Sequence, residues 1–146
     1  MKNTLLLLLF IASSNLFAQN FDKLKLAENE IPNDYKLTEE SKCISIQACT
    51  FYKNPGMYSA LIGKIKSKEI QNFENKRDSG SIMYFEFEKD FEMQGFIEGL
   101  LWGGKKPTKE HPEEFFSWKN ILIIWSFSQN SDLKKISKEK IELEFK

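Results

Sequence analysis

The sequence has little of what builds disulfide-dense, collagen-like or low-complexity proteins: of 146 residues, two are cysteine, four proline and seven glycine. It has no excess of either charge, because 21 basic and 21 acidic side chains cancel. This balance gives no electrostatic reason to expect a nucleic-acid partner. Arginine, which recognises phosphate best, occurs only as Arg77. What is present is a large aromatic supply, 14% of residues, which suits one packed core.

The N-terminus has the layout of a secretory signal peptide. Lys2 precedes an apolar run from Leu5 to Ala12, and small polar residues lead on to Ala18. This apolar run is about eight residues long, whereas a membrane-spanning helix needs roughly 20. We therefore expect residues 1–18 to be removed, no transmembrane segment to remain, and a periplasmic or extracellular location. The leader and the Lys-, Ile-, Asn- and Phe-rich composition are similar to those of small exported bacterial proteins.

The rest of the chain is long enough for one domain. Residues 19–40 are polar and charged, and we interpret them as a loosely ordered lead-in. Residues 41–146 are expected to form a single globular α+β domain around a mainly antiparallel sheet of about five to six strands. Helices are expected at about 90–102 and at about 131–144.

Both helices are predicted from the spacing of apolar residues. In the first, Asp90 is the expected N-cap and Gly103 the expected end, and the apolar positions fall on one helical face: Met93, Phe96, Ile97, Leu100 and Leu101. In the second, Ser131 or Asp132 caps a helix that ends near Phe145.

Alternation of polar and apolar residues predicts strands in the second half. Residues 81–88 alternate cleanly, which predicts a half-buried strand with Tyr84 and Glu86 on its solvent side. Residues 69–73 form a weaker strand. The unbroken apolar run 121–125 is typical of a central strand covered on both faces, with 115–118 as its hairpin partner. Most aromatic residues here are assigned to the core: Phe115, Phe116, Trp118, Trp125 and Phe127.

The region before these strands is ambiguous. Residues 43–52 alternate and favour a strand, although Thr38-Glu39-Glu40 could instead open a helix. A turn at 53–56, containing Pro and Gly, then leads to a second expected strand at 57–66. Residues 43–66 are therefore predicted to form a hairpin.

The two cysteines are six positions apart. Six residues span about 20 Å along a strand and about 9 Å along a helix, whereas the Cα atoms of a disulfide lie within about 7 Å. A Cys43–Cys49 disulfide is possible only with a bend, so we expect two buried thiols instead. The CxxC spacing of thiol oxidoreductases is absent.

No residue is assigned a catalytic or metal-binding role, and no cofactor is expected. His111 is the only imidazole, in a loop without the further His or Cys ligands that zinc sites use. Four carboxylates could in principle supply acid/base chemistry or hold calcium, but we interpret them as the solvated end of a strand and the start of a helix: Glu86, Glu88, Asp90 and Glu92.

The most unusual pattern is a stripe of glycines on the first helix, at Gly95, Gly99 and Gly103. A glycine inside a helix costs roughly 1 kcal/mol relative to alanine, so the stripe calls for a compensating role. One interpretation is close packing against a sheet or the C-terminal helix. The other is a groove for a partner or an apolar ligand, with Trp102 at its rim.

These observations favour a small exported binding or interaction protein that is not an enzyme. Its partner would be an unknown protein or an apolar small molecule. Two alternatives remain open. The first is a carrier that encloses an apolar ligand between the helix at 90–102 and the sheet. The second is a small secreted hydrolase that uses His111 with an acid from 110–114 or 86–92.

Overall fold

The computed structural model describes residues 19–146; the expected signal peptide, 1–18, lies outside the described residues. A five-stranded antiparallel sheet has the order β1-β2-β3-β5-β4. Its strands are β1 (Lys36–Thr38), β2 (Ile65–Glu74), β3 (Ser79–Phe87), β4 (Glu114–Trp118) and β5 (Ile121–Ser126). The expectation of a single α+β domain with an antiparallel sheet and a C-terminal helix is confirmed.

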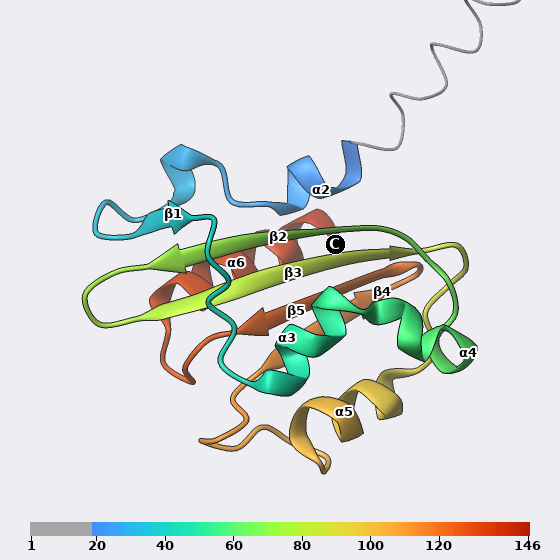
Figure 1. Cartoon of the computed structure of the whole chain (residues 1–146). Coiled ribbons are helices and arrows are strands. Elements are labelled where there is room, and N and C mark those ends of the chain that lie inside the picture. The colour runs from blue at the N-terminus through green and yellow to red at the C-terminus, as the bar shows by residue number, and fades with distance from the viewer. Residues whose placement is uncertain (1–18) are drawn as a thin grey trace, which may run out of the picture.

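Helices cover both faces of the sheet (Figure 1). The α6 face carries α2 (Gln19–Leu24) and α6 (Asp132–Glu144). The α3 face carries α3 (Ile46–Lys53), α4 (Ser59–Ile62) and α5 (Gln94–Trp102). Two short 3-10 turns, η1 (Glu28–Glu30) and η2 (Pro55–Tyr58), complete the described elements. No helix within residues 19–146 combines the length and the apolar character needed to cross a bilayer.

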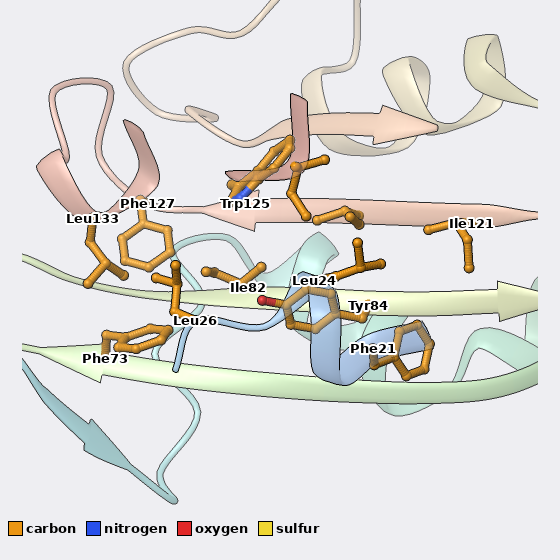
Figure 2. Close-up of a cluster of buried hydrophobic side chains, with 12 residues drawn as sticks. Phe21, Leu24, Leu26, Phe73, Ile82, Tyr84, Ile121, Trp125, Phe127 and Leu133 are labelled. Carbon is orange, nitrogen blue, oxygen red and sulfur yellow. The ribbon is translucent and has the colours of Figure 1, made fainter. Parts of the chain in front are cut away.

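The core on the α6 face is built around β3 and β5 (Figure 2). Alternate side chains of these strands point to this face and meet Leu133 and Ile141 of α6. The strand side chains are Ile82, Tyr84, Ile121, Ile123 and Trp125. Gly80 of β3 lies against Phe127, and a Cβ atom there would overlap the Phe127 ring and the carbonyl oxygen of Ser126.

The α3 face has a second core, formed by the other set of alternate side chains. Phe51 of α3 contacts Phe85 of β3 with ring centroids 5.0 Å apart, and Ile97 and Leu101 of α5 are buried against the same layer. The strand side chains are Met83, Phe85, Phe87, Leu122 and Ile124. The expectation that β3 is half-buried is therefore wrong, since α2 and α6 cover its other face.

Several sequence predictions are confirmed in this region. The β4–β5 hairpin forms, and every residue of β5 is buried. Helix α6 begins after Ser131, whose side chain accepts a hydrogen bond from the backbone N–H of Lys134. Helix α5 ends at Gly103, which adopts a left-handed φ of 62°. It starts later than expected, however, with Met93 and not Asp90 at its N-cap.

The N-terminal half differs more from the predictions. The segment 19–40 is not a loose lead-in: its apolar residues Phe21, Leu24 and Leu26 are buried in the core of the α6 face, and it supplies edge strand β1. The expected hairpin at 43–66 is also wrong. Helix α3, turn η2 and helix α4 occupy most of it, and β2 begins only at Ile65.

Candidate functional site

The structure joins Cys43 and Cys49 in a disulfide, which corrects the expectation of two buried thiols. Their Cα atoms lie 5.8 Å apart, within the usual range for a bridged pair. The bend that this requires occurs at Ser45. Its extended backbone precedes α3, and its side chain accepts a hydrogen bond from the backbone N–H of Ala48, as an N-cap does. Cys43 thus precedes the helix while Cys49 lies in its first turns.

The segment that leads into α3 is fixed to the sheet by its own backbone. The N–H of Lys42 donates to Ser81 Oγ over 3.0 Å, and the N–H of Ile44 donates to Ser126 Oγ over 2.7 Å. We call residues 42–46 the anchored loop. Because its acceptors lie on β3 and β5, the loop is positioned by residues far away in the sequence.

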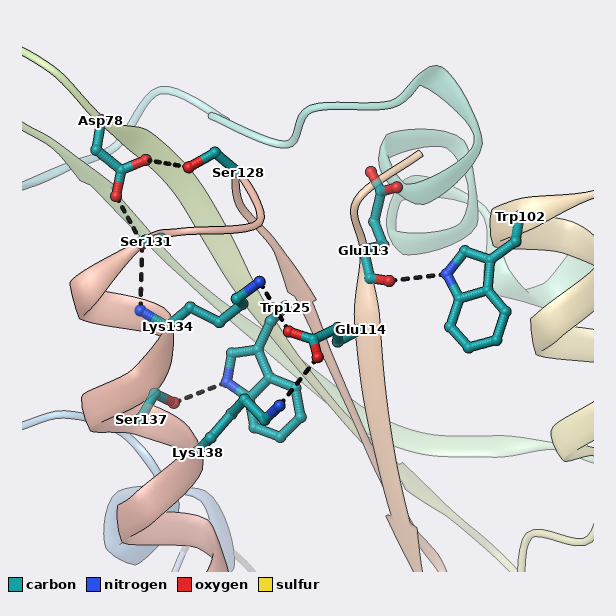
Figure 3. A network of polar contacts seen from close by, with 10 residues as sticks. All are labelled: Asp78, Trp102, Glu113, Glu114, Trp125, Ser128, Ser131, Lys134, Ser137 and Lys138. Carbon is teal, nitrogen blue, oxygen red and sulfur yellow. Dashed lines mark hydrogen bonds and ion pairs between the residues drawn. The ribbon is translucent and has the colours of Figure 1, made fainter. Parts of the chain in front are cut away.

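Glu113 supplies the third anchor. Its side chain is fully buried, and Oε1 accepts hydrogen bonds of 3.0 Å from the backbone N–H of Ser45 and from the hydroxyl of Ser126. The backbone oxygen of Glu113 accepts a 2.7 Å hydrogen bond from Trp102 Nε1 (Figure 3). Glu113, which immediately precedes β4, thereby holds both the start of α3 and the end of α5. Among the described residues, Glu113 Oε2 has no hydrogen-bond partner.

The anchored loop displays two large apolar side chains. Ile44 is 45% exposed. Ile46 is 82% exposed, which is more than any other large apolar residue of the described chain. Single exposed apolar residues are common on protein surfaces. These two are unusual because they lie in a segment held by a disulfide and three hydrogen bonds.

The glycine stripe is a surface feature. A Cβ atom added at Gly95, Gly99 or Gly103 would meet nothing within 4 Å, so the stripe does not serve close packing against a sheet or helix. Trp102 is half-buried and held by Glu113 and by the ring of Phe115, at a centroid distance of 5.7 Å. It is therefore part of the packed layer beneath the stripe.

The candidates for acid/base chemistry are dispersed. His111 Nδ1 is buried and has no hydrogen-bond partner among the described residues, so no described carboxylate accepts a hydrogen bond from that nitrogen. Glu86 is buried, which corrects its assignment to a solvated edge, and it accepts a 3.0 Å hydrogen bond from Ser67 Oγ. The other three carboxylates of that set, Glu88, Asp90 and Glu92, are exposed. Within residues 19–146, no group of three or more His, Cys, Asp or Glu could hold a metal ion.

A polar pocket of about 430 Å³ lies where the β2–β3 turn meets the start of α6. At its centre, Asp78 accepts a 2.6 Å hydrogen bond from the hydroxyl of Ser131 and a longer one from Ser128 (Figure 3). It accepts another 2.6 Å hydrogen bond from the hydroxyl of Tyr35. Burial, together with the hydrogen bond to Asp78, raises the pKa of Tyr35 to about 12, so its hydroxyl remains a donor at physiological pH. These groups satisfy one another, and we interpret the cluster as a structural clamp.

Sequence patterns did not identify the anchored loop or the Asp78 cluster. The one local signal for the loop was Ser45. Serine is a typical N-cap residue, and here it accepts a hydrogen bond from the backbone N–H of Ala48, three residues later. Its acceptors Ser81, Glu113 and Ser126 come from distant segments. Comparisons of the chain with protein-family models, with curated proteins and with solved structures found no match.

Proposed function

We propose that the mature chain is an exported, non-enzymatic binding protein that recognises a partner protein through Ile44 and Ile46. Two features support export. One is the signal-like sequence of residues 1–18, and the other is the Cys43–Cys49 disulfide, because disulfides persist in oxidising compartments outside the cytosol.

The observation that carries the proposal is that Ile46 is exposed although the anchored loop around it is held by a disulfide and three hydrogen bonds. A binding segment that is already ordered loses less conformational entropy on association. The disulfide and the anchors at Ser81, Ser126 and Glu113 supply that order. Burying one isoleucine side chain is worth about 1.5–3 kcal/mol, so the pair could contribute substantially in an apolar pocket of the partner.

Site-specific crosslinking in the cells that make the protein tests this proposal. A photoreactive residue at position 46 should give one crosslinked species, while the same residue at position 143 should give none. Leu143 is a suitable control because it is 71% exposed on α6, away from the anchored loop. The double substitution Ile44→Ser and Ile46→Ser should abolish binding to the crosslinked partner, and Leu143→Ser should preserve it, both at unchanged melting temperature.

Equal crosslinking at positions 46 and 143 would contradict the proposed binding surface. Export is tested separately by intact mass analysis of the natural product. We expect a chain that begins at Gln19 and lacks two hydrogens relative to its reduced form. A cytosolic protein with Met1 in place would contradict export.

The two alternatives receive less support. Between α5 and the sheet, buried Ile97 and Leu101 occupy the space that a carried ligand would need, and native mass spectrometry would detect any added mass. A hydrolase would need a base, and Nδ1 of His111 has no hydrogen-bond partner among the described residues that would orient the ring as one. Replacing His111 with Ala should leave binding to the partner unchanged.

A further inference from the structure

The two edges of the sheet are built differently. Edge strand β1 has three residues, and its Lys36 pairs with Glu74. Short, lysine-bearing edges of this kind discourage pairing with another chain. Edge strand β4 has five residues, Glu-Phe-Phe-Ser-Trp, with no proline, no lysine and no bulge in its register with β5. It therefore lacks the lysine, proline and bulge that protect many edge strands.

The backbone groups on the free side of β4 follow from the hydrogen bonding of β5. The N–H of Phe87 donates to the carbonyl of Asn120, which continues the ladder in which even-numbered residues of β5 bond to β3. The odd-numbered residues of β5 consequently bond to β4, where they pair with Glu114, Phe116 and Trp118. Phe115 and Ser117 must then direct their N–H and C=O groups away from the sheet. No described residue supplies a partner for these groups.

We propose that two copies of this chain associate through β4, antiparallel, about a two-fold axis at Phe116. In this register Phe115 of each copy lies opposite Ser117 of the other. These are the residues with outward backbone groups, so the two pairs form about four hydrogen bonds and join the sheets into one. The edge is thus complementary to itself.

Neighbouring registers satisfy fewer groups. An axis at Phe115 would pair Ser117 with Glu113 of the second copy, whose carbonyl oxygen already accepts the Trp102 Nε1 hydrogen bond. An axis at Ser117 would pair Phe115 with Lys119, which lies in the β4–β5 turn with a left-handed φ of 50°. The axis at Phe116 alone uses all the outward groups of the strand.

The side chains suit the same register. Phe116 would lie opposite Phe116 of the second copy, a cross-strand aromatic pair of a kind that contributes about 0.2–1 kcal/mol. Trp118, which is 41% exposed, would lie opposite Glu114 and diagonal to Phe116 of the second copy. Its exposed ring area would be reduced on association. This interface involves a different surface from Ile44 and Ile46, and it does not depend on the proposed function.

Proline substitution at Ser117 tests the interface. The N–H of Ser117 is directed away from β5, so Ser117→Pro removes an intermolecular donor and leaves the β4–β5 ladder intact. In sedimentation equilibrium, wild type and the control Ser117→Ala should have twice the mass of Ser117→Pro, with all three giving the same circular dichroism spectrum. A monomeric wild type across the concentration series would overturn the proposal.

Cysteine substitution tests the register and does not rely on the proline variant folding. With the axis at Phe116, Cβ atoms at this position of the two copies lie about 4.5–5.5 Å apart, so Phe116→Cys should form an intermolecular disulfide on mild oxidation. The two copies of position 118 lie about 14 Å apart along the strands, so Trp118→Cys should not crosslink. Crosslinking at neither site, or equally at both, would overturn the proposal.

Discussion

The two faces of the sheet are held by different means. On the α6 face, one thirteen-residue helix packs apolar side chains onto the strands, and Trp125 Nε1 donates to Ser137 Oγ of that helix over 2.8 Å. On the α3 face, the helices have four to nine residues. The start of α3 depends on a disulfide, two serines and the buried Glu113.

The difference bears on the proposed binding surface. A long amphipathic helix is stabilised by burial of its apolar face, and α6 adds to this the hydrogen bonds that Ser131 makes to Asp78 and Trp125 makes to Ser137. The anchored loop is instead held by several polar groups, which must be satisfied because unpaired buried polar groups are costly. It leaves Ile44 and Ile46 outside. We interpret this arrangement as support for binding on the α3 face and packing on the α6 face.

The largest expected effect concerns the tightness of packing on the two faces. Gly80→Ala forces a Cβ atom into Phe127 and the Ser126 carbonyl, so we expect a loss of about 3 kcal/mol in the free energy of unfolding. Gly99→Ala places its Cβ in open space on α5 and should gain about 1 kcal/mol from helix propensity. Urea denaturation of both variants measures this. A stabilised Gly80→Ala protein would contradict the close contact.

Smaller losses of stability are expected when the polar supports of the two faces, Glu113 and Ser137, are removed. Glu113→Ala leaves the Ser45 N–H and the Ser126 hydroxyl without their acceptor, and Ser137→Ala does the same to Trp125 Nε1. Each should cost about 1–3 kcal/mol. Only Glu113→Ala should accelerate hydrogen exchange at the backbone N–H groups of Ile44 and Ser45. Equal acceleration in both variants would mean that the anchored loop does not depend on Glu113.

The smallest expected effect is the loss of stability at low pH that Glu114 contributes on the α6 face. Burial tends to raise the pKa of the Glu114 carboxyl, but hydrogen bonds from Lys134 and Lys138 outweigh it and lower that pKa below 4.5. The unfolded chain therefore binds this proton first as pH falls, and stability is lost from about pH 4.5 downward. Glu114→Gln should make this loss shallower, by less than about 1 kcal/mol. Thermal melts between pH 7 and pH 3 measure it, and an unchanged slope would contradict the role of Glu114.

Local patterns predicted the elements whose neighbours are close in sequence. The spacing of Leu133 and Ile141, with Ser131 as cap, was enough for α6, and Gly103 marked the end of α5. Alternation was a poorer guide. Residues 43–52 alternate like a strand, yet the Ser45 cap and the disulfide produce helix α3. Alternation also placed Tyr84 on the solvent side, whereas the apolar residues of α2 and α6, which come from opposite ends of the described chain, bury it.

The sequence by itself determined the β4–β5 hairpin and the C-terminal helix, because each depends on the order of apolar residues within one short segment. It also determined the fold class, which follows from the mixture of strands and helices along the chain. Only the tertiary structure decided the disulfide, the burial of Glu113 and the exposure of Ile44 and Ile46. These depend on hydrogen bonds between residues as far as 82 positions apart. Such partners are brought together by the sheet, so no local pattern records them.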